Sequence, residues 1–147
     1  MRIEIKIEPQ YLDIIDSNQL TIKSYRISSA KNGTGQEKGS LCTPMGKHII
    51  RAKIGTSQPI NTVFIRRRPT GETYSPDLGA RYPDRDWILT RILWLSGCEL
   101  GFNRLGSVDT MRRYIYIHGS PDSIDIGKPG SIGCIRMLNA DLLELFD

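Results

Sequence analysis

The chain has 147 residues, of which 39% are hydrophobic and 24% charged, and its formal net charge is +4. This size and composition predict one globular domain that can bury a core of its own. No apolar stretch approaches the roughly 18 residues of a membrane span, which excludes that class, and the mild positive charge suits an anionic partner without identifying one.

The first eight residues alternate apolar and charged side chains, with Ile3, Ile5 and Ile7 on one face. This pattern is typical of a strand and not of the apolar segment of an export signal. Similar patterns predict strands over residues 3–8, 20–28, 48–54, 62–66, 87–95 and 114–118. Residues 31–46, 66–71 and 74–86 are rich in Gly and Pro and are expected to form loops.

One convincing helix is predicted at the end of the chain. Asn139 is a good N-cap, Asp141 lies in the first turn, and Leu142 begins an apolar stripe that ends at Phe146. Nothing follows Asp147 to cap this helix, so we expect the 1–147 domain to be truncated at its C-terminus. Many short strands with one or two short helices predict a mainly β fold.

The three cysteines are Cys42, Cys98 and Cys134, and the two histidines are His48 and His118. No CxxC motif is present, so we expect no structural zinc site and no other metal site. The apolar neighbours of Cys42 and Cys98 favour buried small side chains. His48 has no candidate partner nearby in the sequence and is expected to be structural.

The most informative segment places His118 at the end of a strand and Cys134 in a Ser- and Gly-rich turn. A thiol is a weak nucleophile until it loses its proton, and a neighbouring imidazole can accept that proton. Spacing alone favours a structural histidine and a small buried cysteine over a catalytic pair.

Three residues around this pair are candidates for binding substrate. Gly133 allows the backbone to turn so that N–H groups around Cys134 form an oxyanion hole. Arg136 lies two positions after the cysteine and is close enough to hold a substrate carboxylate. Tyr116 shares a strand face with His118, where it either covers the substrate or is a core or surface residue.

Several segments resemble the YkuD-like family of L,D-transpeptidase catalytic domains. The His-Gly pair of the family appears as His118-Gly119, and its Ser-x-Gly-Cys-x-Arg motif appears as residues 131–136. Residues 28–35 and the Thr-Pro-x-Gly segment at 43–46 are similar to upstream segments of the same domain. The resemblance covers nearly the whole chain, and the composite motif is specific.

The resemblance implies a role for each matched residue. Cys134 is expected to be the nucleophile, His118 its base, and the carbonyl of Gly119 the group that orients the imidazole. Ser131 is expected to line the substrate site. Many members carry a second histidine between the Ser and the Gly, and this chain has Ile132 there. The implied fold is a sandwich or flattened barrel of mixed strands.

The implied reaction joins two peptidoglycan stem peptides without a metal or organic cofactor. The thiol attacks the third-residue carbonyl of a donor tetrapeptide, D-alanine leaves, and an acceptor amine resolves the thioester into a 3→3 cross-link. Hydrolysis by the same site, as an L,D-carboxypeptidase, and a non-catalytic wall-binding module remain alternatives. The substrate implies a location in the cell envelope or periplasm, although no export signal is visible.

Two further expectations concern charge. The run Arg66-Arg67-Arg68 lacks an aromatic platform for bases in the neighbouring sequence, so a solvated loop is favoured over docking to anionic wall polymer, and no nucleic acid partner is expected. An adjacent imidazolium stabilises a thiolate, so the pKa of Cys134 is expected to fall below that of a free thiol.

Overall fold

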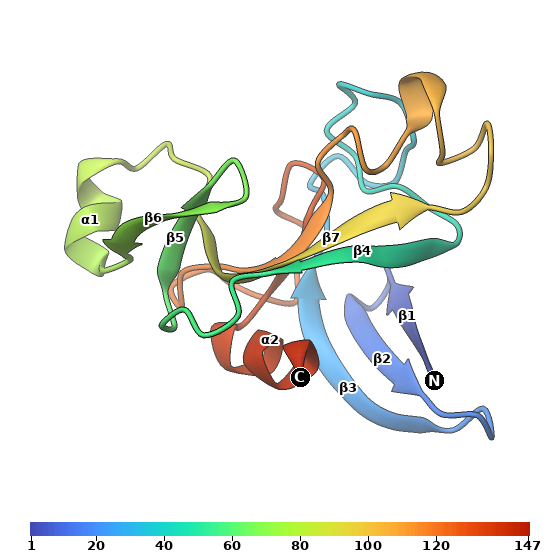
Figure 1. Ribbon diagram of the computed structural model, residues 1–147, viewed down its shortest axis with the longest axis horizontal. Helices are drawn as coiled ribbons and strands as arrows, with labels where there is room; N and C mark the ends of the chain where they lie inside the picture. The colour runs from blue at the N-terminus through green and yellow to red at the C-terminus, as the bar shows by residue number, and fades with distance from the viewer.

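The computed structural model describes residues 1–147 as one mixed sheet of nine strands with two short α-helices (Figure 1). The elements in chain order are β1 (Arg2–Lys6), β2 (Tyr11–Ile15), β3 (Thr21–Ser28), β4 (His48–Ile54), β5 (Thr62–Ile65), β6 (Arg68–Thr73), α1 (Pro76–Arg81), β7 (Ile88–Gly97), a 3-10 turn (Gly106–Val108), β8 (Tyr116–Gly119), β9 (Ile135–Met137) and α2 (Asn139–Phe146). The mainly β, single-domain prediction is therefore confirmed. Neither helix is long and apolar enough to cross a membrane.

The sheet is organised around β7, its longest strand. The strand order is β1-β2-β3-β9-β8-β7-β5-β6, and β4 pairs with the part of β7 that β5 leaves free. All the pairs are antiparallel except β8 and β9, which run in parallel. The parallel pair therefore lies near the middle of the sheet, where neighbouring strands on both sides fix its backbone.

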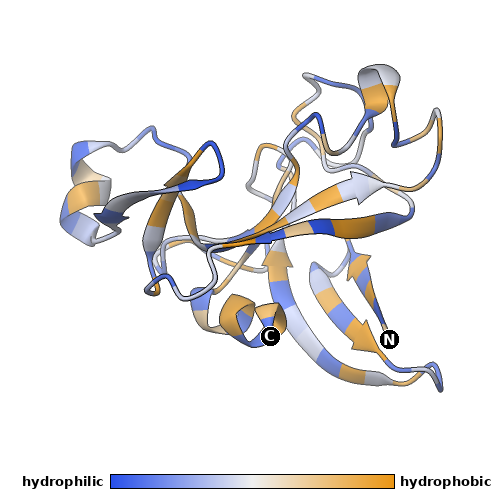
Figure 2. Ribbon diagram, in the orientation of Figure 1, coloured by the Kyte–Doolittle hydropathy of each residue, from blue (hydrophilic) through white to orange (hydrophobic).

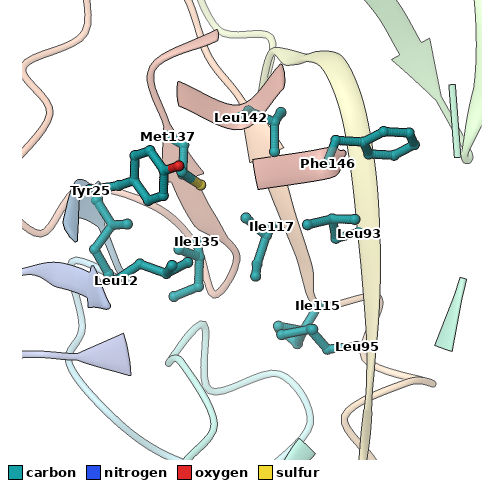
Figure 3. Packing of buried hydrophobic residues seen from close by; sticks show 11 residues of the cluster. Leu12, Tyr25, Leu93, Leu95, Ile115, Ile117, Ile135, Met137, Leu142 and Phe146 are labelled. Atoms are coloured by element: carbon teal, nitrogen blue, oxygen red, sulfur yellow. The ribbon is translucent and has the colours of Figure 1, made fainter. Parts of the chain in front are cut away.

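The main core lies where α2 covers β7 and β8 (Figure 3). Alternate residues of the central strands point to this side, as a period of two requires, and Leu142 and Phe146 of α2 meet them. Figure 2 shows the same alternation of apolar and polar residues along β1 and β2. The cluster contains Leu12, Tyr25, Ile27, Leu93, Leu95, Ile115, Ile117, Ile135, Met137, Leu142 and Phe146.

Three strands and one helix lie where no element was predicted. These are β2, β6, β9 and α1. The helix α1 lies within the predicted loop 74–86, and Ser75 is its N-cap, because the Ser75 side chain accepts a hydrogen bond from the N–H of Leu78. Ser75 followed by Pro76 is a typical start of a helix. The prediction missed it because it relied on the Pro-rich composition of this segment.

The predicted N-cap of α2 is wrong. The N-cap is Leu138, without a side-chain hydrogen bond, and Asn139 is the first helical residue. The Asn139 side chain turns inward, where its Nδ2 lies 2.9 Å from the Ser120 carbonyl oxygen and its Oδ1 accepts a 2.7 Å hydrogen bond from the Thr90 hydroxyl. Asn139 is 1% exposed, so it ties the start of α2 to the strands.

Two side chains differ in exposure from the sequence-based expectation. Cys98 is exposed and Cys42 is half-buried, so neither is a fully buried small side chain. The prediction for His48 fits the structure better, because Nδ1 lies 3.0 Å from the Gly46 carbonyl oxygen and Nε2 lies 2.8 Å from the Thr110 hydroxyl. Both ring nitrogens are thus engaged in structural hydrogen bonds.

Gly119 lies at the end of β8 in a space that admits no side chain. A Cβ there would lie 2.7 Å from the Leu89 carbonyl oxygen and closer still to Oδ1 of Asn139. We expect Gly119→Ala to lower the free energy of unfolding by about 1–3 kcal/mol, the usual cost of overpacking a close-packed interior. Urea unfolding measures this change.

Gly130→Ala is the matched control, because the nearest atom to a Cβ at Gly130 is Nη1 of Arg136 at 3.6 Å, an ordinary contact. Equal stability of the two variants would contradict the close packing assigned to Gly119.

Candidate active site

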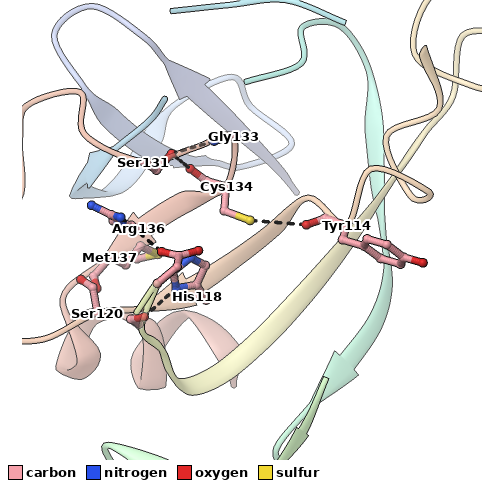
Figure 4. A network of polar contacts seen from close by, with 10 residues as sticks. Tyr114, His118, Ser120, Ser131, Gly133, Cys134, Arg136 and Met137 are labelled. Carbon is pink, nitrogen blue, oxygen red and sulfur yellow. Dashed lines mark hydrogen bonds and ion pairs between the residues drawn. The ribbon is translucent and has the colours of Figure 1, made fainter. Parts of the chain in front are cut away.

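The candidate base, His118, lies on β8, and the candidate nucleophile, Cys134, immediately precedes the parallel strand β9. His118 pairs with Arg136 across β8 and β9, and Cys134 lies two residues before Arg136, level with Tyr116. Side chains alternate along a strand, so Tyr116 and His118 face the same side as Arg136. Figure 4 shows Cys134, His118 and Arg136 gathered in one part of the sheet. The fold thus brings together residues that are sixteen positions apart in the sequence.

The Cys134 thiol is half-buried and lies against the backbone of β8 and the residues before it. Its sulfur accepts a hydrogen bond of 3.3 Å from the N–H of Tyr116, and its S–H donates to the Tyr114 carbonyl oxygen at 3.5 Å. Figure 4 shows the thiol directed towards Tyr114. No hydrogen bond joins it to His118, so a productive pair requires the thiol to turn.

His118 is held in one orientation by its own strand. Its Nδ1 lies 2.6 Å from the carbonyl oxygen of Gly119, and the residue is 1% exposed. A carbonyl only accepts, so Nδ1 carries the proton and Nε2 is left with a free lone pair. That tautomer suits a proton acceptor at Nε2.

Burial sets the protonation of both groups. It raises the pKa of Cys134 to about 12 and lowers the pKa of His118 below its usual value. The hydrogen bond from the Tyr116 N–H partly lowers the pKa of Cys134, and the hydrogen bond to the Gly119 carbonyl partly raises the pKa of His118. The expected fall in the Cys134 pKa is therefore wrong, and at neutral pH the thiol and the imidazole are both uncharged.

The turn of residues 131–134, the cysteine turn, is held by buried hydroxyls. Ser131 Oγ donates to the Cys134 carbonyl oxygen at 2.5 Å and accepts a 3.2 Å hydrogen bond from the Gly133 N–H. Thr43 Oγ1 donates to the Gly133 carbonyl oxygen at 2.9 Å and accepts the N–H of Ala30 at 2.9 Å. Ser131 is 2% exposed, so it braces the turn instead of lining an open surface.

Gly133 has a backbone conformation that favours glycine, with φ of +134°. A Cβ at this position would lie 3.0 Å from Cδ1 of Ile115 and 3.3 Å from the Cys42 carbonyl oxygen. Ile132 next to it points outward and is 55% exposed. It lines a cavity of about 200 Å³ together with Leu41, Tyr114 and Ile115 and the basic residues Lys38, Arg112 and Arg113.

Arg136 is already paired within the chain. Its Nη2 lies 3.3 Å from Oδ1 of Asp86, and its side chain is 16% exposed. Asp86 therefore engages part of the guanidinium, and the role of Arg136 in holding a substrate carboxylate stays a prediction. Asp86 raises the pKa of both Cys134 and His118, whereas Arg136 lowers both.

Tyr116 is 4% exposed and belongs to a small cluster with Phe64 and Ile92. Its hydroxyl accepts a 3.1 Å hydrogen bond from Nη1 of Arg67. Of the alternatives for Tyr116, the core position is the one that the structure supports. No group of three or more His, Cys, Asp or Glu side chains is arranged to hold a metal ion.

Three residues near the site were not identified from the sequence as part of it. They are Thr43, Asp86 and Arg67. Thr43 carried a signal in the Thr-Pro-x-Gly segment, but nothing near Asp86 or Arg67 in the sequence indicates a partner on a distant strand.

Comparison with known proteins identifies a family and a similar solved structure. The YkuD family model, described as the L,D-transpeptidase catalytic domain, matches residues 1–147. Among solved structures, the chain is similar to an L,D-transpeptidase from Xylanimonas cellulosilytica DSM 15894, with 21% sequence identity and a TM-score of 0.51. That similarity covers 99% of this chain and 52% of the other, so this chain spans about half its length. It shows a shared fold. No curated protein matches the chain.

Proposed function

This chain belongs to the YkuD family of L,D-transpeptidase catalytic domains, and on that premise we propose that it transfers peptidoglycan stem peptides through a thioester on Cys134. The observation that carries the proposal is the placement of Cys134 beside a buried His118 whose Nδ1 is fixed on the Gly119 carbonyl. The family acts on peptidoglycan stem peptides, usually outside the cytoplasm. The location we propose for this chain is the cell envelope.

The reaction begins from an uncharged pair, because the pKa of Cys134 is raised and that of His118 lowered. The thiol turns from the Tyr114 carbonyl towards Nε2 of His118, which takes its proton as sulfur attacks the third-residue carbonyl of a donor tetrapeptide. Proton removal and attack occur together, since a free thiolate is scarce at neutral pH. The Gly119 carbonyl stabilises the imidazolium through Nδ1–H.

The tetrahedral intermediate then collapses to a thioester. The bond to the terminal D-alanine breaks, and the His118 imidazolium gives its proton to the leaving amine. The Gly133 N–H is engaged by Ser131 Oγ, so we assign stabilisation of the oxyanion to the N–H of Cys134 itself. An acceptor amine next attacks the thioester, His118 accepts a proton from it, and the Cys134 thiol is restored.

The experiment that tests this function compares products with and without an acceptor. The chain is incubated with a tetrapeptide donor alone and with the donor plus a stem peptide that offers a free third-residue amine. Mass analysis should show released D-alanine in both and a 3→3 cross-linked product only with the acceptor. Tripeptide as the sole product in both would assign a carboxypeptidase. Unchanged donor in both would indicate a non-catalytic wall-binding module.

A further inference from the structure

The hairpin between β5 and β6 turns through two arginines. Ile65 pairs with Arg68, so Arg66 and Arg67 form a two-residue turn, and both have positive φ, of 51° and 65°. Such turns normally take Asn, Asp or Gly, because other side chains are disfavoured there. Arginine in this conformation suggests that contacts beyond the turn hold it.

Those contacts are made by Arg67, which is half-buried and not part of a solvated loop. Its guanidinium lies 4.8 Å from the ring centre of Trp94 and 4.7 Å from that of Tyr114. Its Nη1 also donates to the Tyr116 hydroxyl at 3.1 Å. We call Trp94, Tyr114 and Tyr116 the aromatic platform. The expectation of a solvated loop is therefore wrong for Arg67.

Two residues of the aromatic platform, Tyr114 and Tyr116, contact the candidate nucleophile through their backbone atoms. The carbonyl of Tyr114 accepts the Cys134 S–H, and the N–H of Tyr116 donates to its sulfur. The two tyrosines thus hold the thiol with their backbone atoms and a cation with their side chains. Arg67 reaches the platform from a different strand pair, so its position is independent of the cysteine turn.

Arg136 and Arg113 are the arginines whose charges act on the Cys134 thiol, and unlike Arg67 both have their donors engaged within the chain. Arg136 pairs with Asp86, and Arg113 donates to the carbonyl oxygens of Gly35, Gln36 and Cys42. Arg67 forms no salt bridge, and its only hydrogen bond uses Nη1. The edge formed by Nε and Nη2 has the fork geometry that a carboxylate accepts in a bidentate manner.

We propose that Arg67 binds a carboxylate of the donor peptide while its acyl carbonyl lies at Cys134, which makes Arg67 a specificity-determining residue. This inference rests on the proposed function and names the group by which the site selects its donor. The terminal carboxylate, one residue beyond the carbonyl under attack, is the source we expect.

The first test asks, without any peptide, whether the positive charge of Arg67 attracts an anionic reagent to the Cys134 thiol. Cys134 is alkylated with iodoacetate and with iodoacetamide, and the labelled peptides are quantified by mass spectrometry, with the exposed Cys98 as the internal reference. Arg67→Gln should lower the iodoacetate-to-iodoacetamide rate ratio at Cys134 and leave that at Cys98 unchanged. Arg68→Gln, an exposed neighbour on the same hairpin, should change neither ratio. An unchanged Cys134 ratio in Arg67→Gln would overturn the proposal.

The second test compares donors. Acylation of Cys134 is timed with the free tetrapeptide, with its C-terminal amide and with a donor amidated only at its internal carboxylate. The free donor should exceed the C-terminal amide by about tenfold or more, the scale of one charged hydrogen bond, and Arg67→Gln should remove that preference. Arg67→Lys, which keeps the charge and loses the fork, should retain part of it. If acylation instead slows only with the internally amidated donor, the carboxylate that Arg67 binds is the internal one.

Two results would contradict the inference. If Arg67→Gln lowers the acylation rate equally with every donor, Arg67 only stabilises the hairpin. If both Arg67 variants keep the wild-type preference for the free donor, Arg67 does not contact the carboxylate. If the wild-type chain is acylated by no donor, the proposed function fails, whereas the alkylation ratios still report whether Arg67 acts at the thiol.

Discussion

Replacing Cys134 with serine is expected to reduce turnover of a tetrapeptide donor by at least about a thousandfold, the scale seen when a nucleophile is removed. A hydroxyl is a far weaker acid than a thiol, and His118 would have to remove a proton from it during attack. The fold should persist, because serine can accept from the Tyr116 N–H and donate to the Tyr114 carbonyl as the thiol does. Release of D-alanine and a thermal melt measure the two effects.

Cys98→Ser is the matched control, since that thiol is exposed and lies outside the candidate site. Its turnover should equal that of the wild type. Full activity in a folded Cys134→Ser variant would remove Cys134 from the role of nucleophile.

Replacing His118 with alanine should slow acylation of Cys134 by about a hundredfold or more, the usual scale for loss of a general base. The pH profile should change as well. In the wild type the active imidazole is neutral, and burial lowers its pKa, so the rate should rise with pH through a value below about 6.5 and then stay level. Without His118 the rate depends on ionisation of the thiol, whose pKa is raised, so it should keep rising into the alkaline range.

Rates of acylation measured at a series of pH values test this prediction. His48→Gln is the control, because His48 is the other histidine and bonds only to Gly46 and Thr110. If the wild type and His118→Ala share one rate and one profile, His118 is not the base for Cys134.

The sequence revealed the strands whose side chains alternate. The predicted bounds of β4, residues 48–54, agree with the structure. The strand is rich in Ile, and Gly46 and Gly55 lie near its two ends. The strand β2 was missed. Its buried Asp13 interrupts the apolar pattern and is stabilised only by Lys6 at 2.8 Å and Ser24 at 2.6 Å, partners on neighbouring strands. A three-residue strand such as β9 exists because β3 and β8 pair with it on either side.

The candidate site was predictable in its residue types and not in its electrostatics. The family resemblance, and not spacing alone, indicated Cys134, His118 and Gly119, and the hydrogen bond from His118 Nδ1 to the Gly119 carbonyl lies where the resemblance implied. Their catalytic roles remain predictions. The direction of the Cys134 pKa depends on burial, which spacing does not reveal. The pairing of Arg136 with Asp86 and the contact of Arg67 with Tyr116 join distant segments, and only the fold brings them together.

In the proposed reaction Cys134 carries the acyl group. The most direct measurement is intact-protein mass after brief incubation with a tetrapeptide donor and no acceptor, followed by peptide mapping. We expect one adduct with the mass of the donor less D-alanine, located on Cys134 and absent in Cys134→Ser. A protein that turns over the donor but carries its adduct on Cys42, on Cys98 or on no cysteine would contradict it.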